Sequence, residues 1–385
     1  MEYFLTDEQK EVKKLARAIA EEKILPVRAE LDETEEFPWE IMKILGEADM
    51  FRLCIPEEYE GLGMMCFEQC LVVEELSRVC SGVAVSFAAA HLGIIPLLMY
   101  GTEEQKAKYL PDIASGKRLG AFAVTEPTAG SDIGGIKTTA QKIEEGYIIN
   151  GSKQFITNGG EADIYTVIAL TNKAKGARGA SAFIVEKGIP GFTFGRKEKK
   201  LGIRASATRE LVFENCLVPA ENLIGKEGMG FTITLKLFDS SRPGIGAQAV
   251  GIAQGALEAA VEYARKRIQF GRPIIAIQAI QHILADMAIQ VEAARALVYA
   301  AARTVDSGAK NTTEESAMAK VFASDVAMKV TIDAIQIFGG PGYMRDYPVE
   351  KMMRDAKITQ IYEGTNQVLR NTIASELRKR KARNK

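Results

Sequence analysis

The sequence contains only two histidines, His91 and His282, and a single tryptophan among its 385 residues. Serine–histidine catalysis and many zinc sites depend on histidine, so the chain offers few residues for either. The chain also lacks a Gly-x-Ser-x-Gly elbow, a Gly-x-x-x-x-Gly-Lys-Ser/Thr phosphate loop, and a Gly-x-Gly-x-x-Gly between a strand and a helix. These absences argue against serine hydrolases, P-loop enzymes and Rossmann-type NAD enzymes. A carboxylate base working with a bound organic cofactor is the economical alternative.

Cysteine is scarce, and the net charge is close to zero. The odd count of five favours reduced thiols over a disulfide framework, the residues being Cys54, Cys66, Cys70, Cys80 and Cys216. Cys66 and Cys70 are four residues apart, but without a nearby histidine we expect no metal site. The net charge of −1 gives no electrostatic reason to expect nucleic acid or an anionic membrane as a partner.

The sequence carries no sign of a membrane span or a targeting segment. It has no uninterrupted apolar run of the length that a spanning helix needs, so we expect no membrane span. The first residues, Met1 to Lys10, are acidic and amphipathic, unlike a signal peptide or a transit peptide. We therefore expect a cytoplasmic protein, most simply a prokaryotic one.

The spacing of apolar residues divides the chain into three regions. Residues 1–119 favour helices, and residues 229–385 return to helical spacing after an intervening change of character. Residues 120–228 are rich in β-branched residues and turn signals, and the pair Asn150-Gly151 predicts a hairpin turn. Helix, strand, helix is the layout of a mostly α, α+β chain with segregated domains. Strands are expected at residues 165–170, 181–186 and 209–214, and a break in a long helical stretch at residues 271–273.

The segment from Ile361 to Gln367 is the most informative part of the chain. Its single carboxylate, Glu363, follows Tyr362, whose ring can desolvate the acid and raise its proton affinity. Gly364 lets the backbone come close to a ligand because it has no Cβ. The local pattern fits a general base, and it equally fits a helix that ends at Gly364 with an exposed glutamate.

Four blocks resemble the acyl-CoA dehydrogenases, a family of flavin enzymes, and they occur in that family's order and spacing. The blocks are Thr125 to Asp132, Arg267 to Pro273, Gln336 to Lys351, and Ile361 to Gln367. The resemblance runs essentially from end to end and is closest to the short- and medium-chain members. It implies an N-terminal α-helical domain over residues 1–119, a central β-barrel-like domain over 120–228 and a C-terminal four-helix bundle over 229–385.

The resemblance also implies an activity and its partners. An acyl-CoA is converted to the 2-enoyl-CoA, with Glu363 abstracting the α-proton and N5 of FAD accepting the β-hydride. The thioester oxygen is held by the backbone N–H of the base residue and by a ribityl hydroxyl of the flavin. Electron-transfer flavoprotein takes the electrons, and the enzyme is a homotetramer built as a dimer of dimers. Members without this glutamate carry the base on the helix after the β-domain, where this chain has Ser241.

Contacts to FAD and to the CoA thioester follow from the same match. FAD contacts in the central domain are expected at Phe122, Val124, Thr125, Gly130, Ser131, Phe155, Ile156 and Thr157. Phe155 stands where the family has a tryptophan. A neighbouring subunit is expected to add Arg267, Gln269, Phe270, Gln278, Gln336, Ile337, Gly339 and Gly340, and the segment after the base adds Thr365, Asn366 and Gln367. The thioester contacts are expected at Ser131, Asp239, Arg242, Tyr362 and Gly364.

Several alternatives stay open. Arg267 alone also fits a surface helix charge, and the segment around Phe155 also fits half of a hairpin. Val83 lies where glutaryl-CoA dehydrogenases carry an arginine, which disfavours a dicarboxylic substrate. His91 is either a hydrogen-bonded helix residue or a residue that shapes the acyl pocket for a short, branched or alicyclic group. The whole chain could instead be an oxygen-using acyl-CoA oxidase or a non-catalytic assembly protein on the same scaffold.

Overall fold

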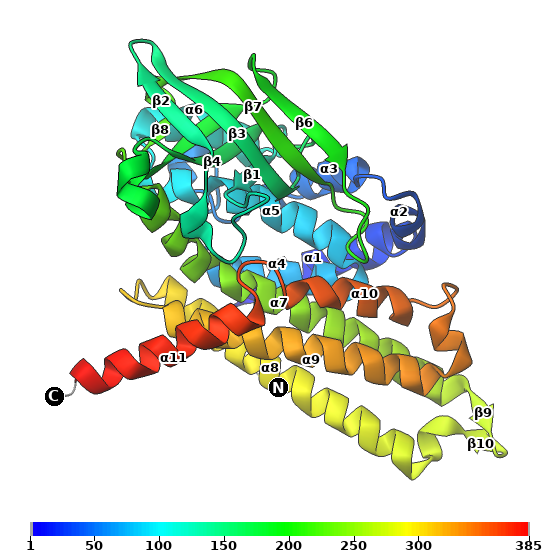
Figure 1. The fold of residues 1–385 in the computed structure, drawn as a ribbon. Coiled ribbons are helices and arrows are strands. Elements are labelled where there is room, and N and C mark those ends of the chain that lie inside the picture. The colour runs from blue at the N-terminus through cyan, green and yellow to red at the C-terminus, as the bar shows by residue number, and fades with distance from the viewer. Residues whose placement is uncertain (1–2, 384–385) are drawn as a thin grey trace.

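The computed structural model describes residues 3–383, with side chains described through Lys379. A mixed sheet lies at one end, and a long helical bundle lies at the other (Figure 1). The helices before the sheet are α1 (Asp7–Ile19), α2 (Arg28–Thr34), α3 (Trp39–Glu47), α4 (Cys66–Val79), α5 (Ser81–Tyr100) and α6 (Glu103–Ala114). Those after it are α7 (Gly230–Lys266), α8 (Gln278–Asp306), α9 (Thr313–Phe338), α10 (Val349–Thr359) and α11 (Asn366–Arg383).

The sheet is built from the central part of the chain. Its strands are β1 (Gly120–Ala123), β2 (Thr139–Ile143), β3 (Gly146–Thr157), β4 (Ile164–Leu170), β5 (Ala180–Glu186), β6 (Phe192–Lys197), β7 (Thr208–Pro219) and β8 (Leu223–Ile224). They run in the order β6-β7-β3-β2-β4-β5-β8, with β1 parallel to β4. Two short strands, β9 (Ile268–Gln269) and β10 (Arg272–Pro273), form a separate hairpin between α7 and α8. The predicted α+β fold class is confirmed.

The hairpin predicted at Asn150-Gly151 is wrong. The chain turns instead at residues 144–145, where Ile143 pairs with Gly146 across β2 and β3. The Asn-Gly pair lies inside β3 at a β-bulge, where Gly151 has a φ of 140°. A Cβ there would approach Thr138 Oγ1 to 2.6 Å, so the glycine serves a close approach and not a turn.

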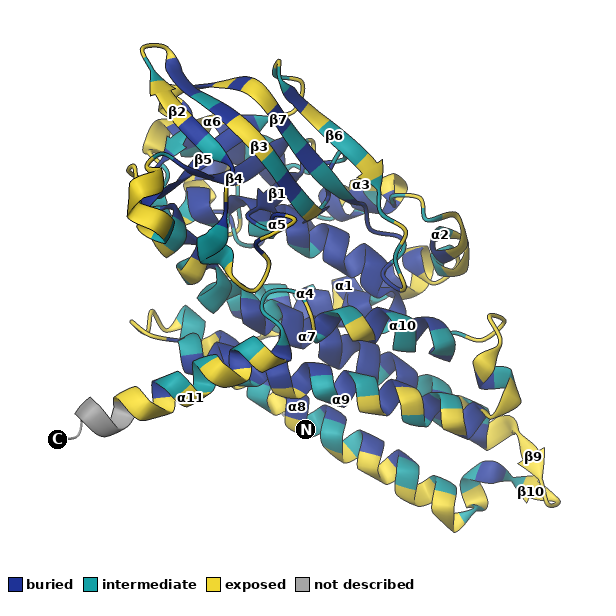
Figure 2. Cartoon of the chain, in the orientation of Figure 1, coloured by how far each residue is buried: buried dark blue, intermediate teal, exposed yellow. Residues whose placement is uncertain are grey.

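Two buried helices form the centre of the molecule. Most of α5 and the middle of α7 are buried, whereas β9, β10 and the outer side of α8 are exposed (Figure 2). Within residues 3–383, α5 alone is long and apolar enough to cross a membrane, with a mean hydropathy of 1.9, but 72% of that window is buried. The α4 and α7 backbones touch, because a Cβ on Gly251 or Gly255 would lie 2.3 or 2.2 Å from an α4 carbonyl oxygen.

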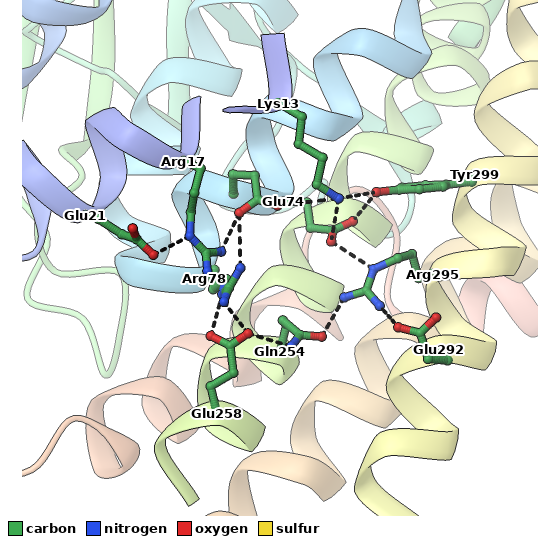
Figure 3. Close-up of polar contacts among 11 residues, drawn as sticks. Lys13, Arg17, Glu21, Glu74, Arg78, Gln254, Glu258, Glu292, Arg295 and Tyr299 are labelled. Carbon is green, nitrogen blue, oxygen red and sulfur yellow. Dashed lines mark hydrogen bonds and ion pairs between the residues drawn. The ribbon is translucent and has the colours of Figure 1, made fainter. Parts of the chain in front are cut away.

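A network of buried charges joins the N-terminal helices to the bundle (Figure 3). Glu74 on α4 accepts hydrogen bonds from Arg295 Nε at 2.9 Å and from the Tyr299 hydroxyl at 2.9 Å, both on α8. Its neighbour Glu75 pairs with Arg17 of α1 at 2.6 Å. Glu74 and Arg295 are 2% and 6% exposed, so these pairs act with little screening by water. The network fixes α1 and α4 on the bundle.

The sheet domain is fixed on α10 by the loop that follows β6. Ile203 N–H donates to Asp355 Oδ1 at 2.5 Å, and Arg354 Nη1 donates to Leu201 O at 3.1 Å. Gly202 packs against the backbone of Arg354, where a Cβ would lie 2.3 Å from the carbonyl carbon. These contacts set the position of α10 and of the segment that leaves its C-terminus.

Candidate active site

Glu363 lies in the turn that joins α10 to α11, and this turn lies between the bundle and the sheet (Figure 1). Helix α10 ends at Thr359, so the alternative of a helix that continues to Gly364 does not hold. Glu363 and Gly364 both have left-handed backbone conformations, with φ of 51° and 95°. For a residue with a Cβ this conformation costs on the order of 1 kcal/mol, so surrounding contacts must hold it.

The Glu363 carboxylate points into protein and is half-buried, not exposed. Ser241 on α7 donates its hydroxyl to Oε2 of Glu363 at 2.6 Å. Burial raises the pKa of Glu363, while the Ser241 hydrogen bond and the charges of Arg242 and Lys320 oppose that rise. A carboxylate whose proton affinity is raised by desolvation suits a general base, because it binds a proton more strongly than a solvated one.

Two cations hold the backbone of the turn. Arg242 Nε donates to the Glu363 carbonyl oxygen at 3.2 Å, and Lys320 Nζ donates to the Gly364 carbonyl oxygen at 2.8 Å. Within residues 3–383, nothing accepts a hydrogen bond from the Glu363 N–H. The turn therefore presents a carboxylate and an unused backbone donor from one residue.

The predicted thioester residues Asp239 and Arg242 lie beside this turn, on α7. Arg242 is 7% exposed, and its Nη1 lies 3.4 Å from Asp239 Oδ1. Asp239 Oδ2 also accepts the Thr313 hydroxyl at 2.8 Å. Burial lowers the pKa of Arg242 and raises the pKa of Asp239. Both side chains thus serve first to hold the turn and the start of α9.

The Tyr362 side chain ties the turn to the core of the molecule. Its hydroxyl donates to Gln248 Oε1 on α7, and Gln248 Nε2 donates to Ser81 Oγ on α5 at 2.7 Å. Sequence reasoning identified neither Gln248 nor Lys320, because both look like ordinary positions of long helices.

The predicted flavin contact of Asn366 stays a prediction for its backbone, because its side chain turns into the protein. Asn366 is 2% exposed, and its side-chain amide is fully used inside the protein. Nδ2 donates to Ser324 Oγ at 2.9 Å and to Asp325 Oδ1 at 2.8 Å, while Oδ1 accepts Lys320 Nζ at 3.0 Å. Asn366 therefore anchors α11 to α9. Its neighbour Thr365 is half-buried, and its neighbour Gln367 is exposed.

The predicted FAD residues of the sheet domain lie in β1, in the loop that follows it, and at the end of β3. The loop after β1 is fixed by a buried pair, because Lys153 Nζ donates to Val124 O at 3.0 Å and to Glu126 Oε1 at 2.7 Å. Gln154 N–H donates to Thr125 O at 2.8 Å and brings β3 against this loop. Burial lowers the pKa of Lys153 to about 8, with Glu126 opposing.

This region fits a planar aromatic cofactor with a phosphate end. Phe155 has a φ of 59° at a second bulge of β3, and its side chain is 59% exposed. Beside it, Thr157 is half-buried and carries a hydroxyl. Gly130 and Ser131 are exposed, and a Cβ on Gly130 would meet nothing within 4 Å. The side chains of Phe122, Val124 and Ile156 are buried, so Val124 and Ile156 can offer a ligand mainly their backbone.

The second predicted FAD set lies apart from the first within one chain. It gathers at the bundle end that carries β9 and β10 (Figure 1). Stacking of Tyr263 on Phe338, with ring centroids 4.1 Å apart, brings the ends of α7 and α9 together there. Most of the set is exposed, namely Arg267, Gln269, Phe270, Gln278, Gln336, Gly339 and Gly340, whereas the Ile337 side chain is buried.

His91 is a hydrogen-bonded core residue of the helical domain. It is 2% exposed, its Nε2 lies 3.2 Å from Phe51 O, and its Nδ1 lies 3.4 Å from Phe87 O. Its ring stacks on that of Phe51 with centroids 5.8 Å apart. Burial lowers the pKa of His91 to about 4, so the ring is neutral at pH 7. These contacts agree with the first alternative for His91, a hydrogen-bonded helix residue.

Comparison with known proteins covers nearly the whole chain. Three domain models of acyl-CoA dehydrogenase match, the N-terminal domain over residues 6–117, the middle domain over 121–216 and the C-terminal domain over 228–378. An acyl-CoA dehydrogenase of Bacillus subtilis is 51% identical over 97% of this chain and 98% of its own length. The short-chain-specific acyl-CoA dehydrogenase of Clostridium acetobutylicum is 48% identical over 98% of this chain and 100% of its own. The acryloyl-CoA reductase (NADH) of Anaerotignum propionicum is 50% identical over 99% of this chain and 97% of its own.

Solved structures agree with this picture. Butyryl-CoA dehydrogenase from Megasphaera elsdenii superimposes with a TM-score of 0.95 at 48% identity, covering 98% of this chain and 100% of its own. A chain from the structural study of the electron transferring flavoprotein of Acidaminococcus fermentans superimposes with a TM-score of 0.96 at 52% identity, covering 98% and 99%. The chain described above therefore belongs to the acyl-CoA dehydrogenase family, whose members are FAD-binding oxidoreductases.

Proposed function

We propose that this enzyme dehydrogenates a short- to medium-chain acyl-CoA between Cα and Cβ, with Glu363 as the base that removes the α-proton. The observation that carries the proposal is the turn at Glu363, which offers a partly desolvated carboxylate and a free N–H together. Bound FAD supplies the acceptor for the hydride that leaves Cβ. The relatives named for short-chain and butyryl substrates support the lower end of the chain-length range.

Glu363, Ser241 and Arg242 have separate roles in the proposed reaction. The Glu363 carboxylate takes the α-proton, and its N–H donates to the thioester oxygen, where negative charge develops as the proton leaves. Ser241 orients the carboxylate, and Arg242 keeps the turn in its left-handed conformation. Each donor of this kind contributes on the order of 3 kcal/mol to lowering the barrier.

A relative that is named a reductase raises the question of direction. Microscopic reversibility means that the same turn can run the reaction either way, with Glu363 delivering a proton to Cα in the reductive sense. We propose dehydrogenation as the working direction, with electron-transfer flavoprotein as the electron acceptor. Reduction of an enoyl-CoA with reduced nicotinamide as the electron donor would support the reductive alternative.

We also propose a homotetramer. The second FAD set is exposed at the bundle end that carries β9 and β10, apart from the first set, so a neighbouring subunit would be needed to complete an FAD site. Light scattering at several protein concentrations tests this. A monomer or a dimer that retains full FAD occupancy would overturn it.

Glu363→Gln tests the central role. We expect this variant to bind FAD and acyl-CoA but to reduce its flavin at least about a thousandfold more slowly, because the amide cannot take the proton. The assay is anaerobic bleaching of the flavin band with butyryl-, hexanoyl-, octanoyl-, isobutyryl-, glutaryl- and cyclohexanecarboxyl-CoA. Near-wild-type bleaching by the variant would refute the assignment. Fast aerobic reoxidation of the wild type with peroxide release would favour an oxidase.

A further inference from the structure

Lys320 on α9 contacts the turn that carries Glu363 and is fully buried, with 0% exposure. Its Nζ donates to the Gly364 carbonyl oxygen at 2.8 Å and to Asn366 Oδ1 at 3.0 Å. No carboxylate among the described side chains forms an ion pair with it. A lysine is rarely buried without a carboxylate partner, because removing its charge from water is costly. The neutral oxygens of the turn therefore take the place of a counter-ion.

We propose that Lys320 is a positioning residue for catalysis, which fixes the direction in which Glu363 presents its carboxylate and its N–H by holding the next carbonyl along the chain. This inference rests on the proposed role of Glu363.

The geometry of the turn supports this role. Arg242 and Lys320 hold the carbonyls of Glu363 and Gly364, so two successive peptide planes are fixed by two different helices. Lys320 also holds Asn366, whose N–H donates to Gln360 O at 3.0 Å and closes the turn. With both ends and both carbonyls fixed, the strained Glu363 conformation has little freedom to relax.

The charges around Lys320 link it to the base as well. It faces Glu363 on the turn, Arg242 on α7 and Asp325 on α9. Burial lowers the pKa of Lys320 to about 7, and the negative charges of Glu363 and Asp325 oppose that change while Arg242 adds to it. In return, the Lys320 charge lowers the pKa of Glu363. Removing the charge should therefore raise the pKa of the base.

Two substitutions separate the hydrogen bond from the charge. Lys320→Met removes both, and Lys320→Gln keeps an amide N–H that can donate to the Gly364 carbonyl while removing the charge. A control is Arg295→Met, because Arg295 is also buried and its partners Glu74, Glu292 and Gln254 lie outside the turn. Each holoenzyme is mixed anaerobically with butyryl-CoA from pH 5 to 9, and its thermal unfolding is recorded.

For Lys320→Met we expect flavin reduction at saturating butyryl-CoA to slow about tenfold or more, the usual effect of losing a hydrogen bond to a charged group. The dissociation constant for butyryl-CoA should stay within about twofold, since the lost interaction acts on the turn and not on the ligand. The acid limb of the rate profile should move to higher pH in both Lys320 variants, and Lys320→Gln should recover part of the rate. Arg295→Met should lower thermal stability without moving the limb.

A wild-type rate and an unmoved acid limb in either Lys320 variant would overturn the proposal. So would a loss of thermal stability like that of Arg295→Met with unchanged flavin reduction. The Glu363→Gln result stands apart from these outcomes. If that variant is inactive while the Lys320 variants behave as wild type, the base assignment survives and the positioning role fails.

Discussion

The buried pair between Glu74 and Arg295 makes a quantitative prediction about stability. Arg295→Met removes the 2.9 Å bond to Glu74 and also the 2.7 Å bond from Nη2 to Gln254 Oε1. Glu74 then keeps the Tyr299 hydroxyl and a distant charge, Lys13 at 3.9 Å. Leaving a carboxylate buried without its partner costs about 3–5 kcal/mol of unfolding free energy.

The matched control is an ion pair that lies in water. Arg345 Nη1 lies 2.7 Å from Glu33 Oε2, with the two side chains 68% and 64% exposed. Because solvent screens this pair, Arg345→Met should cost no more than about 1 kcal/mol. This control compares a buried arginine with an exposed one. Because Arg295→Met also removes contacts to Glu292 and Gln254, the Glu74 pair itself is isolated by the double-mutant cycle.

A double-mutant cycle completes the test. Glu74→Met combined with Arg295→Met removes both charges, so the double variant should recover about half or more of the loss caused by Arg295→Met alone. Urea unfolding of the FAD-loaded protein, followed by circular dichroism, gives the free energies. A loss below about 1 kcal/mol for Arg295→Met, or strictly additive single effects, would refute the reasoning.

Two further changes act on the catalytic turn. Ser241→Ala removes the hydroxyl that lowers the pKa of Glu363, so that pKa should rise and the acid limb of flavin reduction should move to higher pH; a limb that stays in place or moves to lower pH would contradict this. Gly202→Ala places a Cβ 2.3 Å from the Arg354 carbonyl carbon, so we expect a loss of about 1–3 kcal/mol from overpacking and slower flavin reduction as α10 shifts. Differential scanning calorimetry and anaerobic bleaching check the second change, and an unaltered melting temperature would show that α10 can adapt.

The elements that follow from local chemistry were predictable. The strands expected at residues 165–170 and 181–186 differ from β4 and β5 by one residue at the start, because β-branched runs between turn residues have few other options. The break at residues 271–273 falls in the β9–β10 hairpin, where glycine and proline end the helical pattern.

The misses have physical causes. Asn150-Gly151 fits a turn locally, but pairing of β3 with β7 on either side keeps that segment extended, and the glycine relieves contact with Thr138 instead. For Asn366, the motif gave a position without the direction of the side chain. Its amide turns inward and accepts from the buried Lys320, which leaves only its backbone as a predicted flavin contact.

Long-range polar partners were beyond the sequence altogether. Lys320 and Gly364 are 44 residues apart, and Lys153 and Glu126 are 27 apart. Apolar periodicity indicates which helix face is buried, but it does not say which polar side chain on that face meets which acceptor. The contacts of Lys320 and Gln248 with the Glu363 turn therefore follow only from the structure.

The left-handed conformation of Glu363 lets one residue offer both a carboxylate and a free N–H, whatever acyl chain the pocket accepts. Inside a helix, the N–H of a residue donates to the carbonyl oxygen four positions earlier. A helical glutamate could therefore offer a ligand only its side chain. In the proposed reaction, proton removal and recognition of the thioester oxygen both come from Glu363 and so share one Cα. Their spacing is then set by the covalent geometry of a single residue, and remodelling the surrounding pocket for another acyl chain leaves it unchanged.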